Sequence, residues 1–389
     1  MLVETPFSDP GIPPHLRIAV VHEWFTRWAG SEAVLEQILA CLPTAELFAV
    51  ASHPDAEGRQ RLAGRRIQTS FIQRLPFGAK RPQVWLPWLP QAVEQLDLRG
   101  FDLVISNSHC VAKGVITSPD CVHLAYVHSP ARYAWDLQHV YAQEIPWPLR
   151  GLWRAQMQRL RNWDMASAVR PDAIACNSNY IARRVAHAWG RNAQVIHPPV
   201  AVDEFTLGTS RGDAYVTASR MVGYKQVPLI ARTFAKTPQR RLIVIGDGPE
   251  LPQVQAIARD APHIRVLGHL PRTEVIRHLR EARAFIFAAE EDFGISPVEA
   301  LACGTPVIAF GKGGAVETVV DGITGLFFER QEEDCLAAAL NRYEAGPVPD
   351  PAACRAQALK FSPEIFRERF MHFVSAALRE RRLGNPRVF

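Results

Sequence analysis

The sequence lacks any run of 18 apolar residues, although 48 % of its 389 residues are hydrophobic. A transmembrane helix needs about 20 such residues in a row, so we expect none. The first 14 residues hold acidic side chains and prolines but not the cationic start and apolar core of a signal peptide. We therefore expect residues 1–16 to form a poorly ordered N-terminal extension of a cytoplasmic protein.

Paired cysteines and a strong net charge are also missing. The seven cysteines are scattered and never form a Cys-x-x-Cys motif, which favours reduced thiols in a cytoplasmic protein. The formal net charge is only +5 and no nucleic-acid-reading motif occurs, so we expect no nucleic-acid partner. A mildly basic protein does suit an anionic substrate or membrane surface.

Short apolar segments typical of buried strands occur in two separate series, between residues 17 and 176 and between residues 214 and 310. Helical patterns separate the strands within each series. This alternation predicts an α/β protein with two doubly wound parallel sheets. The adjacent Pro198 and Pro199 would break any regular element and mark the joint. The expected parts are an N-terminal domain (17–197), a C-terminal domain (198–360) and a final helical segment (361–389).

One segment joins acidic side chains to a glycine loop and a helix start. Residues 284–289 are continuously apolar, as expected for a strand buried on both faces, and Glu291 follows them. Ser296 fits a helix N-cap, with Pro297 as the first helical residue. Ligands bind at the carboxyl edge of parallel sheets, so Glu291 is a candidate ligand-binding residue. Glu299 fits two interpretations, a second ligand-binding acid or the partner of Ser296 in a capping box.

The same segment resembles the retaining glycosyltransferases of family 4. The resemblance rests on the spacing Glu-x7-Glu, with Phe-Gly after the first acid and Ala-Leu-Ala-Cys-Gly-Thr-Pro directly after the second. It extends over residues 17 to 380. It implies the GT-B fold, in which two Rossmann-like domains face a central cleft and the final helix crosses back to the N-terminal domain.

The resemblance also implies roles for residues of the C-terminal domain, which would bind most of the nucleotide-sugar donor. Glu299 would bind the ribose hydroxyls and Glu291 a sugar hydroxyl. The backbone around Phe293, Gly294, Ile295 and Ser296 would complete the sugar site, and the backbone of Gly268 would meet the nucleobase. Structural turns explain the glycine-rich pieces at 246–249, 267–269 and 312–314 nearly as well.

Two cations follow the first strand of the second series. Arg220 and Lys225 match the Arg-x4-Lys pair that holds the donor diphosphate in this family, although most Arg and Lys are simply solvated. A planar guanidinium and a point-like ammonium together neutralise a leaving diphosphate well. No Asp-x-Asp triplet occurs in the sequence, so we expect catalysis without a metal ion or other cofactor.

The N-terminal domain supplies further candidates. Gly30 lies where the family usually has two glycines near the diphosphate, but this chain has only one, and a plain helix-start glycine is the alternative. His128 follows a predicted strand at the position of a family histidine that lies beside the donor sugar. Lys113, Arg132 and Asp136 belong to stretches that resemble a branch of bacterial O-antigen and exopolysaccharide mannosyltransferases. They are candidates for donor or acceptor contacts or for structural roles in their loops.

The branch resemblance favours transfer of mannose from GDP-mannose to a lipid-linked oligosaccharide in surface polysaccharide synthesis. A UDP-sugar transferase of the same fold, a nucleotide-sugar epimerase and a non-catalytic nucleotide- or glycan-binding protein are the alternatives. The residues expected to hold the donor, which we call the clamp, are all present, and this disfavours the non-catalytic protein. They are Arg220, Lys225, Glu291 and Glu299.

Basic and aromatic residues alternate in two stretches, residues 65–90 and 147–163. Such mixtures suit an anionic bilayer surface, but they also occur on exposed flanks with buried tryptophans. We expect a protein that binds peripherally to the inner face of the cell membrane.

Overall fold

The computed structural model describes residues 12–13, 15–143, 145–208 and 210–382. The chain divides into two compact units. Unit 1 comprises Met1–His197 and Phe366–Phe389, and unit 2 comprises Pro198–Ile365. Most of the predicted N-terminal extension lies outside the described residues. Two described members of it, Ile12 and Leu16, pack against the core of unit 1.

Unit 1 is built on a seven-stranded parallel sheet with the strand order β3-β2-β1-β4-β5-β6-β7. Every residue of the central strands β4 and β5 is buried, as expected for a parallel sheet that is covered on both faces. The strand order reverses between β1 and β4, because the connection after β1 leads to one side of the sheet and the connection after β4 to the other. In sheets of this kind ligands bind at the carboxyl ends of the strands where the order reverses. The strands are β1 (Ile18–Phe25), β2 (Glu46–Ser52), β3 (Ile67–Thr69), β4 (Leu103–Ser108), β5 (Val122–Val127), β6 (Ala173–Cys176) and β7 (Gln194–Val195).

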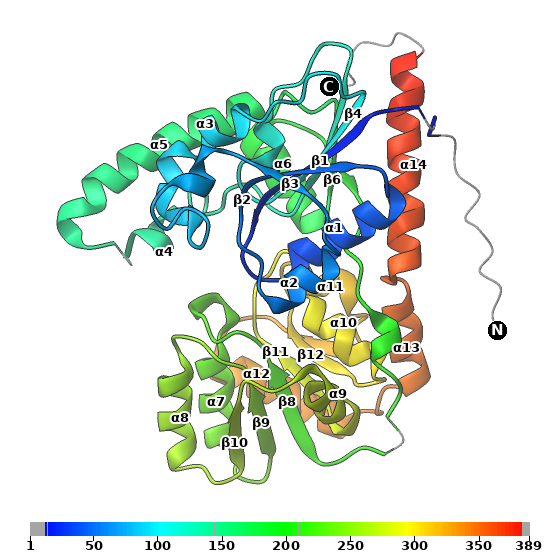
Figure 1. Cartoon of the computed structure of the whole chain (residues 1–389). Helices are drawn as coiled ribbons and strands as arrows, with labels where there is room; N and C mark the ends of the chain where they lie inside the picture. The colour runs from blue at the N-terminus through cyan, green and yellow to red at the C-terminus, as the bar shows by residue number, and fades with distance from the viewer. Residues whose placement is uncertain (1–11, 14, 144, 209, 383–389) are drawn as a thin grey trace. The chain divides into compact units, whose positions relative to one another are not determined.

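Helices cover the two faces of this sheet (Figure 1). The α-helices before the joint are α1 (Gly30–Cys41), α2 (Ala56–Arg61), α3 (Leu89–Glu94), α4 (Gln138–Gln143), α5 (Arg150–Ser167) and α6 (Asn179–Trp189). Short 3-10 turns are η1 (Phe71–Arg74), η2 (Pro82–Trp88), η3 (Ala112–Gly114) and η4 (Trp147–Leu149).

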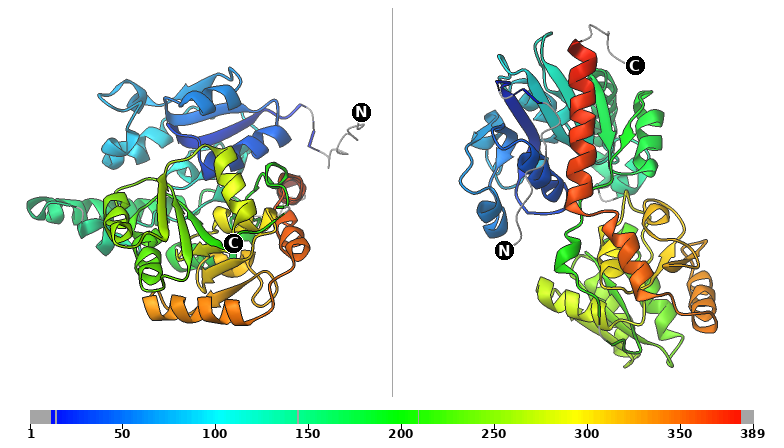
Figure 2. Two further views of the ribbon diagram at one scale, coloured as in Figure 1. Left: turned by 90° about the horizontal axis from the view of Figure 1, so that it is seen from below. Right: turned by 90° about the vertical axis from the view of Figure 1, so that its right-hand side faces the viewer.

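The final helix α14 (Pro363–Arg382) lies within the predicted final helical segment (361–389). Its apolar side, with Phe366, Phe370 and Phe373, is buried in the core of unit 1. The ring of Phe366 lies 5.7 Å from the ring of Tyr126 on β5. The right-hand view in Figure 2 shows the helix, in red, along the strands of this unit.

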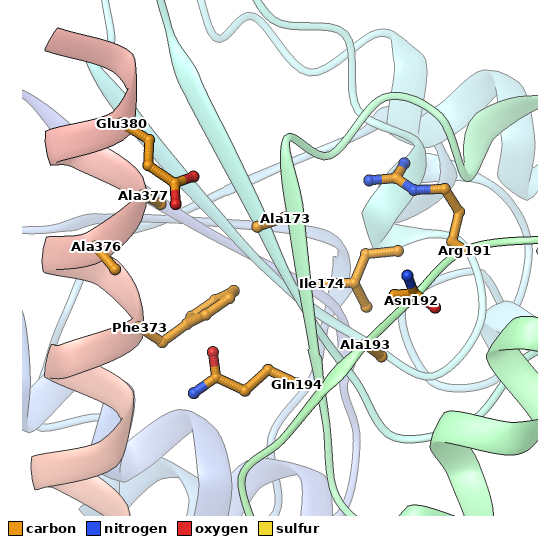
Figure 3. A pocket seen from close by; sticks show the side chains of 10 residues that line it. All are labelled: Ala173, Ile174, Arg191, Asn192, Ala193, Gln194, Phe373, Ala376, Ala377 and Glu380. Carbon is orange, nitrogen blue, oxygen red and sulfur yellow. The ribbon is translucent and has the colours of Figure 1, made fainter. Parts of the chain in front are cut away.

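A cavity of about 310 Å³ lies between α14 and the edge of the sheet at β6 and β7. Phe373 and Glu380 of α14 line it opposite Ile174 and Gln194 (Figure 3). It is remote in the fold from the carboxyl-edge loops that carry the predicted site residues of unit 1.

Unit 2 contains a six-stranded parallel sheet with the order β10-β9-β8-β11-β12-β13. Alternate residues of its strands enter two separate cores, so that Phe285 and Phe287 of β11 face one core and Ile286 the other. The strands are β8 (Ala214–Ala218), β9 (Arg241–Ile245), β10 (Ile264–Gly268), β11 (Phe285–Phe287), β12 (Val307–Phe310) and β13 (Gly325–Phe328).

The helices of unit 2 belong to both faces of its sheet. They are α7 (Val227–Ala235), α8 (Leu251–Arg259), α9 (Arg272–Glu281), α10 (Ile295–Ala302), α11 (Ala315–Thr318), α12 (Glu333–Ala345) and α13 (Pro351–Leu359), with the 3-10 turns η5 (Val202–Glu204) and η6 (Gly223–Lys225). The predicted fold class, two doubly wound parallel sheets, is confirmed. Within the described part of the chain, no helix combines the length and the apolar character needed to cross a bilayer.

Candidate functional site

The carboxyl edge of the sheet in unit 2 brings two predicted residues together. Lys225, at the end of η6 after β8, forms an ion pair with Glu291, which follows β11. Their side chains are only 13 % and 16 % exposed. The rings of Tyr224 and Phe287 lie 5.6 and 5.8 Å from the Lys225 ammonium. The edge therefore holds a half-buried ammonium and carboxylate that a ligand can separate.

Arg220 lies on the same loop as Lys225, and its side chain is exposed. Among the described residues it forms no ion pair, in contrast to Lys225. The intervening Met221 is fully buried and fixes the loop to the domain core. The two predicted cations thus differ, one paired with an acid and one directed to solvent.

Two glycines allow the turn after β9 to pack closely against the loop that carries Arg220 and Lys225. Gly246 and Gly248 have φ values of +130° and +150°. A Cβ atom at Gly246 would lie 1.9 Å from the carbonyl oxygen of Ser219, and one at Gly248 would lie 2.5 Å from that of Met221. The turn after β9 therefore braces the loop of Arg220 and Lys225. This favours the structural interpretation of that glycine-rich piece.

The loop after β12 supports Glu291 in the same way. The amide of Gly314 donates to the carbonyl of Glu291 over 2.7 Å. A Cβ atom at Gly314 would lie 2.2 Å from Cα of Phe293. The side chain of Phe293 itself is buried against Phe361, so only its backbone can meet a ligand. Gly268, the last residue of β10, accepts the amide of Gly246 over 2.8 Å.

Helix α10 begins two residues earlier than predicted. Gly294 is its N-cap, with φ of +86°, and Ile295 is its first residue, so the prediction of Ser296 as N-cap is wrong. Glycine adopts this left-handed conformation without strain, and it therefore sets the start of the helix. In the part of the chain that the structure describes, the amides of Ile295 and Ser296 have no acceptor. They can donate to an anion at the positive end of the helix.

The shifted start also removes the capping-box interpretation of Glu299, because the helix has no side-chain cap. The Glu299 carboxylate lies 3.6 Å from the guanidinium of Arg272 and is 18 % exposed. Burial raises the pKa of Glu299, and the charges of Arg272 and Lys225 only partly oppose this effect. Glu299 is thus a ligand-binding candidate with no role in capping.

The carboxyl edge of unit 1 carries a chain of hydrogen bonds that ends at His128. The Nε2 atom of His128 lies 2.7 Å from Oδ1 of Asn107. The amide nitrogen of Asn107 donates to the carbonyl of Ser31 and lies 3.2 Å from Nδ1 of His22. His22 in turn lies 3.2 Å from Glu32. Since Asn107 offers its oxygen, His128 carries its proton on Nε2 and presents Nδ1 as an acceptor.

Burial, and next the charge of His109, lowers the pKa of His128 to about 3, so this side chain is neutral. Burial would also lower the pKa of His22, but the hydrogen bond and charge of Glu32 outweigh it and raise that pKa. Burial would raise the pKa of Glu32, but His22 lowers it to about 2. The backbone carbonyl of His128 accepts the side-chain amide of Asn177 over 3.0 Å.

Sequence reasoning missed the roles of Asn107, His22 and Glu32. The signal was present as Ser-Asn-Ser-His at the end of a predicted strand, and the neighbouring strand carries His22 as the partner of Asn107. Glu23, next to His22, is fully buried. One of its oxygens accepts the amides of residues 109–112 over 2.8–3.0 Å and so fixes the turn after β4.

Gly30 is the first residue of α1, next to the N-cap Ala29. The carboxylate of Glu32 accepts the amide of Ala29 over 3.1 Å and the hydroxyl of Ser31 over 2.8 Å. The start of this helix is therefore braced by the same acid that pairs with His22. A diphosphate contact at Gly30 stays a prediction.

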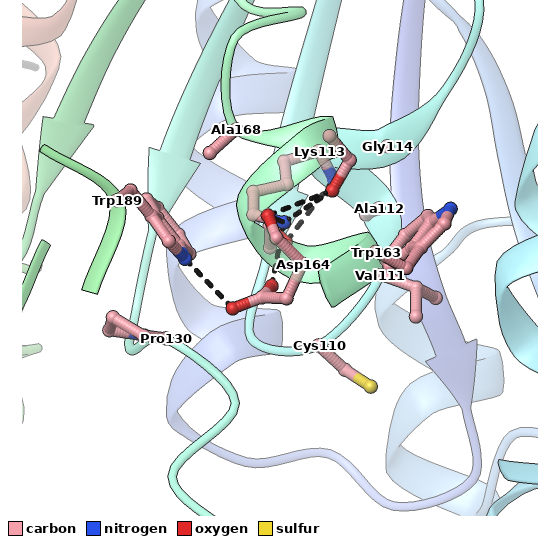
Figure 4. Close-up of polar contacts among 12 residues, drawn as sticks. Cys110, Val111, Ala112, Lys113, Gly114, Pro130, Trp163, Asp164, Ala168 and Trp189 are labelled. Carbon is pink, nitrogen blue, oxygen red and sulfur yellow. Dashed lines mark hydrogen bonds and ion pairs between the residues drawn. The ribbon is translucent and has the colours of Figure 1, made fainter. Parts of the chain in front are cut away.

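Lys113 is fully buried, which contradicts its prediction as a donor or acceptor contact. Its ammonium lies 2.7 Å from Oδ1 of Asp164 and donates to the hydroxyl of Ser167 over 2.8 Å. Trp163 and Trp189 flank it, and the indole of Trp189 donates to Asp164 over 2.8 Å (Figure 4). Lys113 therefore joins η3 to α5 inside unit 1.

The other two branch-specific candidates lie on the loop after β5. Asp136 is half exposed and forms an ion pair with Arg184 of α6 over 2.5 Å. Arg132 is half-buried. Among the described residues no cluster of three or more His, Cys, Asp or Glu side chains is arranged to hold a metal ion. Independence from metal remains a prediction.

Comparisons with known proteins agree with this geometry. The sequence profile described as Glycosyltransferase Family 4 matches residues 28–204, and that described as Glycosyl transferases group 1 matches residues 210–361. Together they match most of both units. The chain belongs to glycosyltransferase family 4. The family 4 protein shares its fold with HepE from Anabaena, solved with UDP and glucose, at a TM-score of 0.68 and 17 % identity, over 93 % of this chain and 100 % of that chain.

Curated relatives match more closely in sequence but over shorter regions. A GDP-mannose-dependent alpha-(1-6)-phosphatidylinositol monomannoside mannosyltransferase from Mycolicibacterium smegmatis is 28 % identical over 53 % of this chain and 60 % of that protein. A D-inositol 3-phosphate glycosyltransferase from Mycolicibacterium paratuberculosis is 30 % identical over 47 % of this chain and 46 % of that protein. The family 4 chain thus spans about half the length of these relatives.

The corrected role of Lys113 can be tested by unfolding. We expect Lys113→Met to lower the free energy of unfolding by about 3–5 kcal/mol, because Asp164 would remain buried without its partner charge. The double variant Lys113→Met/Asp164→Asn should recover most of this loss. Denaturant titration of both, with the exposed Lys80→Met as control, measures the effect. A single variant as stable as the control would contradict a structural role.

The His22–Glu32 pair predicts a pH dependence. The folded pKa of His22 is above the unfolded value of about 6.5, so its stabilisation is complete below that pH and is lost as the pH rises through the raised pKa. Glu32, with a pKa of about 2, stays charged in this range. We expect unfolding free energies to fall above about pH 6.5 in the natural protein and to change less in His22→Gln. His187→Gln, at an exposed position, is the control. If the free energy of unfolding falls with pH as steeply in His22→Gln as in this control, the His22–Glu32 pair is not the cause.

Proposed function

We propose that the protein is a retaining glycosyltransferase that moves a hexose from a nucleotide sugar to a glycan acceptor. The Lys225–Glu291 pair is the observation that carries this proposal. It holds an ammonium and a carboxylate at the ligand-binding edge of unit 2, beside the free amides at the start of α10. A leaving nucleoside diphosphate gains negative charge, and fixed cations can stabilise that charge in place of a metal ion.

In this mechanism Arg220 and Lys225 bind the diphosphate from one loop. The exposed guanidinium of Arg220 offers parallel donors to phosphate oxygens, and Lys225 supplies a compact charge. When the diphosphate draws Lys225 away, the carboxylate of Glu291 becomes available to accept a sugar hydroxyl. The amides of Ile295 and Ser296 add donors, and Glu299 accepts the ribose hydroxyls.

Retention requires attack on the face that the leaving group departs from. The bond between the anomeric carbon and the phosphate oxygen breaks, and its electron pair goes to the diphosphate. The acceptor hydroxyl forms the new bond, and its proton passes to a leaving phosphate oxygen. No protein carboxylate is then needed as nucleophile. His128 is neutral, and its Nε2 atom bonds to Asn107, so its Nδ1 atom would accept a hydrogen bond from a sugar hydroxyl.

We propose mannose from GDP-mannose as the donor, with a lipid-linked oligosaccharide of surface polysaccharide synthesis as acceptor. The name of the Mycolicibacterium smegmatis relative, a GDP-mannose-dependent mannosyltransferase, supports this donor. Both curated relatives are named for acceptors that carry a phosphate group. A UDP-sugar donor is the alternative that the binding experiment below separates.

Calorimetric titration of the protein in EDTA with GDP, UDP, ADP and GDP-mannose tests the donor. We expect GDP and GDP-mannose to bind at least about tenfold more tightly than UDP and ADP, a difference of about 1.4 kcal/mol. A preference for UDP would refute the mannosyl assignment but keep the fold and the clamp. Binding that requires added metal would refute the roles of Arg220 and Lys225.

Variants test the clamp itself. Lys225→Ala and Glu291→Ala should each reduce sugar transfer by at least about 10²-fold, because each removes a group placed for transition-state charge or sugar position. The matched controls Lys236→Ala and Glu281→Ala change exposed residues of the same unit. Full activity in a folded clamp variant would remove that residue from the mechanism.

We also propose peripheral binding to the inner face of the cell membrane. Exposed apolar side chains gather where α4 meets α5, with Trp147 at 80 %, Leu149 at 53 % and Leu152 at 71 % exposure. The exposed Arg150 and Arg154 lie among them. Apolar side chains that can enter the headgroup region, next to cations that attract anionic lipids, favour such binding. These five residues form the membrane patch.

Vesicle sedimentation tests the membrane patch. We expect binding to anionic vesicles to weaken at least about tenfold in Trp147→Ala/Leu152→Ala, since burying one large apolar side chain contributes ~1.5–3 kcal/mol. The control Ile323→Ala/Val348→Ala removes two other exposed apolar side chains, from unit 2. Equal binding by both double variants would refute the membrane patch.

A further inference from the structure

The loop that follows β5 separates two cavities of unit 1 with opposite chemistry. One, the apolar cavity, has a volume of about 270 Å³ and is lined chiefly by Trp24, Leu86, Tyr133, Tyr141, Ile145 and Trp153. The other, the cationic cavity, has a volume of about 630 Å³ and is lined chiefly by Trp135, Asp136, Arg161, Tyr180, Arg183 and Arg184. Both lie among segments that follow the carboxyl ends of strands.

The loop after β5 forms a thin wall between the two cavities. Tyr133 faces the apolar cavity and Trp135 the cationic one, and two residues of extended chain span at most about 7 Å. Ala131 and Ala134 of the same loop are buried against Met157 and Leu160 of α5. The wall is therefore held in place by packing, and a single amphiphilic molecule can contact both cavities.

The apolar cavity fits a hydrocarbon chain. The rings of Tyr133 and Tyr141 lie 6.1 Å apart on one side, and the Tyr133 hydroxyl contacts Cys110 and so is not free to bind a polar group. Ile145 and Trp153 line this cavity, and in the sequence they lie on either side of the exposed Trp147, Leu149 and Leu152 of the membrane patch. The cavity and the membrane patch are therefore built from the same short segment of the chain.

The cationic cavity fits a phosphate group. Tyr180, Arg183, Arg184 and His187 recur at the spacing of one face of α6 and point along one wall. Arg161 of α5 is fixed opposite by bonds to the carbonyl of Ala134 and to Gln138, 2.6 and 2.7 Å long. Asp136, paired with Arg184, is the one acid among the lining residues, against three arginines. The excess positive charge and the planar guanidinium groups suit a phosphate or diphosphate.

We propose that these two cavities form the acceptor site for a lipid phosphate or diphosphate. The phosphate groups bind Arg161, Arg183 and Arg184, the first hydrocarbon units lie in the apolar cavity, and the rest of the lipid continues toward the membrane patch. This inference rests on the proposed function, because it assigns the acceptor of the same reaction. It also gives Asp136 a role different from a direct acceptor contact, since its carboxylate positions Arg184 for the phosphate.

Farnesyl diphosphate, farnesol and inorganic diphosphate are suitable probes for the full-length protein, with binding measured by calorimetry. Arg183→Ala/His187→Ala changes two exposed side chains of the cationic cavity, and Trp153→Ala opens the apolar one. We expect farnesyl diphosphate to bind at least about tenfold more weakly to each variant. Inorganic diphosphate should respond only to the arginine–histidine variant, and farnesol only to Trp153→Ala.

Two controls separate this proposal from the proposed function. Arg159→Ala removes an exposed arginine of α5 that lines neither cavity and should leave all three probes unaffected. Lys225→Ala should weaken nucleotide binding and not farnesyl diphosphate binding. Farnesyl diphosphate that binds equally to the natural protein and Arg183→Ala/His187→Ala, or that loses affinity only in Lys225→Ala, would overturn the acceptor site while leaving the donor site intact.

Discussion

Both sheets are parallel throughout, and this constraint determines where chemistry can occur in the protein. Every strand of a parallel sheet ends at the same edge, so loops that are distant in the sequence meet there. In unit 2 this edge joins Lys225, after β8, to Glu291, after β11. In unit 1, hydrogen-bond contacts near this edge join His22 of β1, Asn107 of β4 and His128, which follows β5. Helices and cores serve mainly to hold these edges rigid.

Three ion pairs that differ in burial show how burial decides what a charged side chain can contact. Lys113 and Asp164 are sealed from solvent and join two segments. His22 and Glu32 are also buried, and they lie next to Asn107, whose side-chain oxygen sets the tautomer of His128. Lys225 and Glu291 remain partly exposed, so a ligand can reach their charged groups. Burial therefore decides which of these ion pairs is accessible from solvent.

The sequence predicted features that depend on order along the chain. Apolar runs indicated the strands, and the position of Glu291 and Lys225 after two of them placed both at one edge. Ser296 was wrong as an N-cap because a left-handed Gly294 starts the helix earlier, a property of backbone angles that residue spacing does not reveal. The prediction that Lys113 contacts the donor or acceptor was wrong. Its partner Asp164 lies 51 positions away in the sequence, so nothing in the sequence distinguishes this buried lysine from a surface lysine. Asn107 was missed because its contacts join strands that pair only in the folded sheet.

The return of α14 to unit 1 has a consequence for synthesis on the ribosome. The core of unit 1 includes Phe366, Phe370 and Phe373, so it stays incomplete while residues 198–365 are being translated. Unit 2 has its own cores and can fold during that interval. During that interval the part of unit 1 that precedes residue 198 leaves some of its apolar surface uncovered. Such a surface favours binding by a chaperone. Helix α14, which follows unit 2 in the sequence, completes the core of the unit that precedes it.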